Sequence, residues 1–242
     1  MRITTPDQRL ALAPHVRACA SDGQVILLDL RNSAYLGLGG AACAALADQV
    51  DGWPRSAASL PERMTSEATQ QTLTNLLQRG LLTTGKPRES APATVDEVTA
   101  SLNAEDNAPN AGVGIRRLAR FLLSAVETSM WLRCRSLQAI AMAVRARRDR
   151  LHSPSTPSSI ESARSGTAAY ERLRPFAFSA HKNCLHDSLA LVAFLAAEDT
   201  FPRWVIGVKT RPFGAHSWVQ MGTTVLNDQH EVVRQFRPIL VV

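Results

Sequence analysis

The chain has 242 residues, of which 45% are hydrophobic and 20% are charged, and its formal net charge is +6 at pH 7. This length and apolar content exclude a disordered or fibrous chain and are sufficient for a folded protein with a substantial core. No uninterrupted apolar run of about 18 residues is present, and residues 1–20 lack the apolar segment of a secretion signal, so we expect a cytoplasmic protein without a membrane span.

The positive charge is concentrated in residues 115–150, where nine arginines accompany only two acidic residues. A solvated helical face is the ordinary explanation for such a segment, and an acidic partner or a membrane surface are the alternatives. The four cysteines, Cys19, Cys43, Cys134 and Cys184, are widely separated and form no CxxC pair. We therefore expect free thiols rather than a metal site or a disulfide framework.

Residues 1–83 are predicted to form a separate domain. Three short strands are expected around the turn signal Asp22–Gly23, and three helices are expected after them, the last capped by Ser66 and stopped by Gly80. The strands are predicted at 16–19, 24–30 and 34–38, and the helices at 41–49, 56–63 and 67–78. This order is typical of a winged helix-turn-helix domain.

Winged helices often bind DNA through their last helix. The corresponding segment here, SEATQQTLTNLLQRG, contains one arginine and no lysine, which is poor for neutralising phosphates. The segments LLDLRNSAYLGL, DGWP and LLQRGLL instead resemble the PqqD-like peptide-recognition domain. The resemblance implies that a leader peptide adds as a strand beside residues 34–38, next to the last helix. The leader-binding residues implied are Tyr35, Leu36, Leu38, Leu73, Leu76 and Leu77, and most of these leucines are equally suited to the core.

Residues 84–112 are rich in Pro, Ala, Ser and acidic residues and are predicted to be a linker, with one helical turn near 95–102. Residues 113–242 would form the second domain. Its long helical stretch, 115–150, places Leu118, Leu122, Ala125 and Ser129 on one expected buried face. A second Ser/Pro-rich loop is expected at 152–166.

Cys184 directly precedes an almost wholly apolar run with helical length, which predicts a buried central helix. Asn183 is a suitable N-cap, and Asp187 lies in the first turn, where the helix dipole favours an acid. A cysteine at a helix N-terminus has a lowered pKa and is a candidate nucleophile. Metal ligation is not expected at any residue.

Strands are predicted at 204–210, 214–222 and 224–228, and a final strand is expected within 232–242, with Pro238 favouring a sheet edge. If Met221–Gly222–Thr223 form a three-residue loop, His216 faces Asp228; an even loop shifts the register by one residue and places Asn227 there. Either side chain could accept a hydrogen bond from the imidazole and orient it. Asp228 is the preferred third member of a Cys184–His216–Asp228 triad, with Asn227 second. His181 and His186 are weaker alternatives for the base, and His15, His152 and His230 are expected at the surface.

Four segments, NCLHDSLAL, WVIGVKT, AHSWVQM and VLND, together resemble the lasso-peptide B proteins, the leader peptidases of that class of ribosomal peptides. The resemblance implies an α+β protein with a PqqD-like domain fused to a transglutaminase-like or papain-like cysteine protease domain, in which a buried helix packs on an antiparallel sheet. One departure is Asp187, because many members of the family carry arginine there.

The implied function is removal of the leader peptide from a lasso-peptide precursor before macrolactam closure. The implied partners are the precursor peptide and an asparagine-synthetase-like macrolactam synthetase, with no nucleic acid or membrane. No bound cofactor is implied, and since no GxxxxGK[ST] loop is present, any ATP requirement is expected to come from the synthetase. The alternatives are a transamidase, in which an amine replaces water, and a winged-helix DNA-binding regulator.

Overall fold

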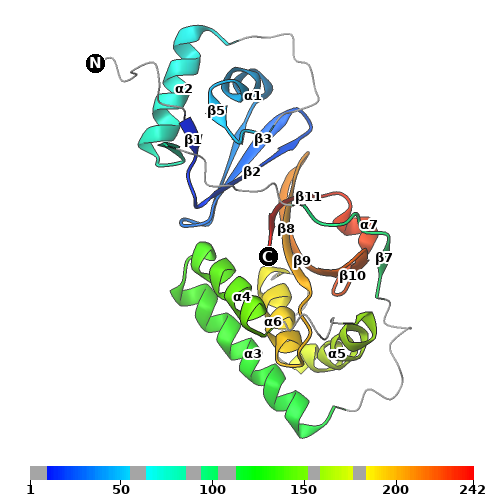
Figure 1. Ribbon diagram of the computed structural model, residues 1–242. Helices are drawn as coiled ribbons and strands as arrows, with labels where there is room; N and C mark the ends of the chain where they lie inside the picture. Colours follow the sequence, from blue (N-terminus) through cyan, green and yellow to red (C-terminus); the bar gives the residue numbers. More distant parts are fainter. Residues whose placement is uncertain (1–9, 55–63, 86–93, 103–112, 152–158, 177–183) are drawn as a thin grey trace. The chain divides into compact units, whose positions relative to one another are not determined.

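The computed structural model describes residues 10–54, 64–85, 94–102, 113–151, 159–176 and 184–242, and it combines helices and sheets (Figure 1). The α+β prediction is therefore confirmed. The chain divides into two compact units, the first formed by residues 1–93 with 209–213 and the second by residues 94–208 with 214–242.

The first unit contains an antiparallel sheet in the order β2-β3-β4, made by β2 (Val16–Ser21), β3 (Gln24–Asp29) and β4 (Ala34–Leu38). Asp22 and Gly23 connect the first two strands with φ angles of 48° and 78°. Two successive positive φ angles are what a tight two-residue hairpin requires, which is why Asp-Gly is favoured there. The three predicted strands and this turn are confirmed.

A second sheet of the first unit, in the order β5-β1-β6, was not predicted. Its strands are β1 (Leu10–Leu12), β5 (Val50–Asp51) and β6 (Leu82–Thr84). Strands of two or three residues are too short to show an alternating pattern, and their partners lie far away in the chain. The prediction of three strands for this part of the chain was therefore incomplete.

Helices α1 (Gly40–Ala47) and α2 (Ser66–Gln78) confirm two of the three helices expected in the first unit. Thr65, rather than Ser66, caps α2, because its side chain accepts a hydrogen bond from the Ala68 N–H. Leu73 and Leu76 of α2 lie in the core of this unit. The helix expected at 56–63 lies outside the described residues, so the winged-helix assignment remains a prediction.

The second unit is built on a five-stranded sheet in the order β11-β8-β9-β10-β7 (Figure 1). Neighbouring strands are antiparallel except for β10 and β7, which are parallel. The strands are β7 (Ala100–Ser101), β8 (Arg203–Thr210), β9 (Phe213–Met221), β10 (Thr224–Val225) and β11 (Arg237–Val241). The helical turn expected near 95–102 was wrong, because this segment contains no helix and its residues Ala100–Ser101 pair with β10 as an edge strand.

The C-terminal segment begins with a short helix, α7 (His230–Val233), where a strand was expected. The strand itself, β11, lies at the sheet edge as Pro238 indicated, and its register shifts between Pro238 and Leu240. Proline has no N–H to donate to a ladder, so an edge with a bulge accommodates it.

Helix α6 (Cys184–Ala196) is the central helix of the second unit, and every residue from Asp187 to Ala196 is buried. It packs against α3 (Ile115–Cys134), α4 (Leu137–Leu151) and α5 (Ile160–Leu173). The predicted buried helix is therefore confirmed. The loop expected up to residue 166 was wrong from Ile160 onward, because Ser159 caps α5 by accepting the Ser162 N–H.

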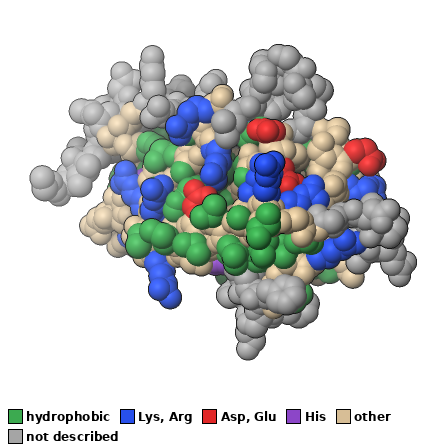
Figure 2. Space-filling model, turned by 90° about the horizontal axis from the view of Figure 1, so that it is seen from below, with side chains coloured by type: hydrophobic (Ala, Val, Ile, Leu, Met, Phe, Trp, Pro, Cys, Tyr) green, Lys and Arg blue, Asp and Glu red, His purple; other side chains and the backbone are tan. Residues whose placement is uncertain are grey.

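The buried face expected for the long helix was partly wrong, because Ala125 is buried and Ser129 is half-buried but the two leucines are exposed. Leu118 and Leu122 of α3 are 38% and 52% exposed, whereas Phe121, Ser124, Ala125 and Thr128 face inward. The outward face also carries Ile115, Leu123, Val126 and Met130. Figure 2 shows a band of hydrophobic side chains bordered by basic ones. Periodicity identified an amphipathic helix, but it could not show which face packs inward.

Candidate active site

Cys184 is the first residue of α6, so its thiol lies where helical N–H groups have no partner within the helix. A hydrogen bond with the His216 side chain lowers the pKa of Cys184, and this effect exceeds the opposing effect of burial. Backbone hydrogen bonds from Ser217 and Leu185 lower the pKa further. The site therefore favours the thiolate, which is the nucleophilic form of cysteine.

His216 lies on β9, where its ring is close to two aromatic side chains. The Trp218 ring is stacked with it at a centroid distance of 6.3 Å, and the Phe236 ring lies at 5.1 Å. Burial lowers the pKa of His216, but hydrogen bonds with Asp228 and Cys184 outweigh burial and raise the pKa to about 9. Protonated His216 beside a Cys184 thiolate is therefore the state that the surroundings stabilise.

Asp228 is bonded to His216, with 2.6 Å between Asp228 Oδ2 and His216 Nε2. Burial raises the pKa of Asp228, but the hydrogen bonds from His216 and from the Gln229 N–H outweigh it, so the pKa is lowered. An ionised Asp228 holds a proton on Nε2, which leaves Nδ1 as the ring nitrogen for Cys184. The structure thus brings together the three residues of the predicted triad.

The strand register behind this arrangement differs from both predictions. Thr224 pairs with Met221 and Val225 pairs with Gln220, so only Gly222 and Thr223 form the loop. A continued ladder in this register would place Gln229 opposite His216. Instead β10 ends at Val225, and Asp228 reaches the imidazole from the irregular segment that follows. The prediction of a strand over 224–228 was wrong beyond Val225.

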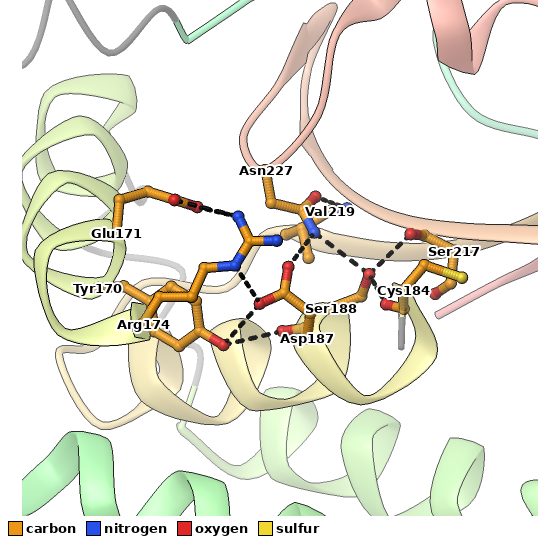
Figure 3. Close-up of polar contacts among 9 residues, drawn as sticks. All are labelled: Tyr170, Glu171, Arg174, Cys184, Asp187, Ser188, Ser217, Val219 and Asn227. Carbon is orange, nitrogen blue, oxygen red and sulfur yellow. Dashed lines mark hydrogen bonds and ion pairs between the residues drawn. The ribbon is translucent and has the colours of Figure 1, made fainter. Parts of the chain in front are cut away.

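Asn227, the second choice for orienting the histidine, makes other contacts. Its Oδ1 accepts the Val219 N–H at 2.8 Å, and its Nδ2 lies 3.4 Å from Asp187 Oδ2 and 3.3 Å from Ser188 Oγ. Figure 3 shows Asn227 between the strand that carries Val219 and the helix that carries Asp187. Asn227 therefore belongs to a polar cluster beside the Cys184–His216 pair.

Asp187 does more than occupy a favourable place in the helix dipole. Its Oδ1 lies 3.1 Å from Arg174 Nε and 3.1 Å from the Tyr170 hydroxyl (Figure 3). Arg174 belongs to the short helix η2 (Arg174–Phe176) and also pairs with Glu171 at 3.2 Å. Sequence reasoning missed Arg174, because no local pattern links it to a carboxylate on another helix.

Of the alternative bases, His186 contacts a serine on another helix. His186 Nε2 lies 2.9 Å from Ser129 Oγ, and burial lowers the pKa of this histidine. His181 and the expected cap Asn183 lie outside the described residues, as does His152. His15 was wrongly expected at the surface, because it is 6% exposed and lies 3.8 Å from Asp29.

The residues implied for leader binding differ in exposure. Leu73 and Leu76 are only 4% and 2% exposed and belong to the core of the first unit. Leu36, Leu38 and Leu77 are partly buried against that core. Tyr35 is half-buried on β4, a strand whose only partner among the described residues is β3.

Neither a metal site nor a membrane span is found in the described ranges. Within them, no cluster of three or more His, Cys, Asp or Glu side chains is arranged to hold a metal ion. None of the helices that the structure describes combines the length and apolar character needed to cross a membrane.

Comparison with known proteins points to the second unit. Residues 122–241 match the model of the transglutaminase-like superfamily. A stretch of 46 residues is 46% identical to the microcin J25-processing protein McjB of Escherichia coli, and it covers 19% of this chain and 22% of that protein. No solved structure matches the chain significantly. The part of the chain that holds Cys184, His216 and Asp228 is therefore a transglutaminase-like domain.

Proposed function

We propose that this protein is a cysteine peptidase that removes the leader peptide from a lasso-peptide precursor. The observation that carries the proposal is the position of His216, which is hydrogen-bonded to Asp228 and to Cys184 at the start of a buried helix. The match to the transglutaminase-like superfamily and the similarity to a protein named for processing microcin J25 support it.

The reaction would begin with attack of the Cys184 thiolate on the carbonyl carbon of the scissile peptide bond. Collapse of the tetrahedral intermediate breaks the C–N bond, and the imidazolium of His216 gives its proton to the departing amine. Neutral His216 then takes a proton from water, which attacks the thioester and releases the leader as a carboxylic acid. The Cys184 N–H is a suitable donor to the oxyanion because of its place at the helix N-terminus.

For the first unit we propose leader binding along β4. Because this strand pairs on one side only with β3 among the described residues, a peptide could add to its other edge through backbone hydrogen bonds. The resemblance to PqqD-like domains supports this role. The precursor peptide would be one partner and a macrolactam synthetase the other, the latter consuming the released core.

The proposal is tested by incubating the full chain with a lasso precursor peptide encoded beside its gene and measuring the products by mass spectrometry. Wild type should release a leader fragment, and Cys184→Ala should release none. Cys134→Ala is the matched control, because Cys134 is an exposed cysteine in the same unit. Undiminished cleavage by Cys184→Ala would exclude the proposed nucleophile.

The same products distinguish hydrolysis from amine transfer. A leader mass that contains one added water indicates peptidase activity. A leader joined to an added amine would instead establish the transamidase, which uses the same thioester.

A further inference from the structure

Asn227 connects the strand that carries the histidine to the helix that carries the cysteine. All three of its hydrogen-bonding functions are used, since Oδ1 accepts from Val219 and the two Nδ2 protons point to Asp187 and Ser188. Reversing the amide would place NH₂ against the Val219 N–H and oxygen against the Asp187 carboxylate. The donors and acceptors therefore fix the orientation of Asn227.

The contact with Val219 also explains how Asp228 reaches His216. The backbone ladder continues one step past β10, with the Leu226 N–H donating to the Val219 carbonyl at 2.9 Å. The Val219 N–H then bonds to the Asn227 side chain instead of to another backbone carbonyl. This side-chain hydrogen bond takes the place of the next backbone hydrogen bond, so the pairing of the two strands ends there. The chain then leaves the sheet, and Asp228 approaches the imidazole.

Asp187 gives Asn227 a fixed acceptor within α6. Asp187 is 7% exposed, and a buried carboxylate is stable only when it is paired and hydrogen-bonded. Arg174 and the Tyr170 hydroxyl provide these partners on Oδ1, which leaves Oδ2 for the Asn227 amide (Figure 3).

Ser188 extends the connection to the reacting pair. Its hydroxyl lies 2.7 Å from the Cys184 carbonyl oxygen and 2.8 Å from the Ser217 carbonyl oxygen. Because Ser217 follows His216 directly, one buried hydroxyl touches the backbone of the nucleophile and of the residue next to the base. The Asn227 amide donates to this hydroxyl and so joins both contacts.

We propose that Asp187 and Asn227 form a positioning pair that holds Cys184 against His216 and brings Asp228 to the imidazole. They act through other residues, not on the substrate. The proposal rests on the proposed roles of Cys184, His216 and Asp228, and it assigns to Asp187 a function as the anchor of Asn227.

The test measures how fast iodoacetamide alkylates Cys184 in the full chain as a function of pH, with mass spectrometry of the peptide that contains Cys184. In Asn227→Leu, the apparent pKa of this thiol should rise by roughly one unit. At a pH below the apparent pKa of both proteins, alkylation should then fall about tenfold, because the thiolate fraction changes by that factor per pKa unit. Val192→Ala is the control for stability, since it removes buried packing from the same helix without a polar contact. It should lower the melting temperature and leave the pH profile unchanged.

A second pair of variants separates positioning from general loss of structure. Asn227→Asp places two carboxylates together and should lose reactivity as Asn227→Leu does. Adding Asp187→Asn to Asn227→Asp restores one amide and one carboxylate, with the direction of the hydrogen bond between the two side chains reversed. The double variant should recover at least about half of the alkylation rate that Asn227→Asp loses. This comparison also decides the question if Asn227→Leu does not fold.

The proposal of a positioning pair would be overturned if the pH profile of Cys184 alkylation were unchanged in Asn227→Leu. It would also be overturned if the double variant recovered none of the lost alkylation rate. Because the assay uses no peptide substrate, it is independent of precursor cleavage. A shifted profile in a protein that cuts no precursor would remove the proposed function and leave the positioning pair intact.

Discussion

His216 and Asp228 are joined by a 2.6 Å hydrogen bond although the strand register does not place them opposite each other. The bond depends on a chain that leaves the sheet after Val225 and is held there by Asn227. The orientation of the imidazole is thus set by an irregular segment and not by the regular ladder. This relationship determines several measurable properties of the site.

The first prediction concerns the pH dependence of activity. Activity should rise as Cys184 ionises and fall as His216 loses its proton at about 9, where its pKa lies. In Asp228→Asn, the carboxylate that raises the pKa of His216 is absent, so the alkaline limb should move to lower pH. The rate of precursor cleavage, measured from about pH 5 to about pH 10, checks the alkaline limb, and the rate of Cys184 alkylation over the same range reports only the ionisation of the thiol. An alkaline limb that is identical in Asp228→Asn would contradict it.

The raised pKa of His216 also contributes to the stability of the folded protein. Because the folded protein raises the pKa of His216 from 6.5 to about 9, the contribution is complete below pH 6.5 and is lost as the pH rises through about 9. Asp228→Asn should therefore destabilise the protein more at pH 6 than at pH 10. Urea denaturation at the two pH values measures the difference.

The second prediction concerns Gly207 of β8. A Cβ at this position would lie 2.7 Å from Trp218 Cη2 and Cζ3 and 2.9 Å from Phe236 Cβ. Gly207→Ala should cost about 1–3 kcal/mol by overpacking, and it should lower activity because both aromatic rings lie against His216. Gly37→Ala is the control for stability alone, since nothing lies within 4 Å of its Cβ position but β4 is the proposed leader-binding strand. Equal melting temperatures for the two variants would exclude the steric effect.

The third prediction concerns Arg148, one of the arginines of the basic segment. Its guanidinium is within 2.8 Å of the backbone oxygens of both Pro202 and Val242, and burial lowers its pKa to about 10. Arg148→Met should destabilise the protein by about 2 kcal/mol, because two buried acceptors lose their donor. Arg145→Met, at an exposed position of the same helix, should change the free energy of unfolding by less than about 0.5 kcal/mol. Thermal and urea denaturation would show the contrast.

The fourth prediction separates leader binding from core packing in the first unit. Leu76→Ala should cost about 2–5 kcal/mol of stability, since Leu76 is 2% exposed. Tyr35→Ala, on the half-buried edge strand, should weaken binding of a fluorescent leader peptide with a smaller loss of stability. Fluorescence anisotropy with the full chain, together with denaturation, checks both. Normal leader affinity in Tyr35→Ala would remove this residue from the proposed binding edge.

Much of the architecture followed from local patterns. The apolar run after Cys184 predicted a buried helix, alternation predicted β8 and β9, and Asp22–Gly23 predicted the first hairpin turn. These features depend on neighbouring residues, whose spacing or backbone freedom is directly visible in the sequence. Very short strands carry no such pattern, which is why β1, β5, β6 and β7 were missed.

The sequence by itself determined that a cysteine begins a buried helix and that a histidine and an acidic residue follow it on or near strands. Only the tertiary structure decided which acid reaches the histidine, because a two-residue loop and one side-chain hydrogen bond fix the path of the chain. It also decided that Asp187 pairs with Arg174 and that Phe121 of α3 faces inward while Leu118 and Leu122 face outward. Each of these depends on residues distant in sequence meeting in space, where no local period or spacing records the contact.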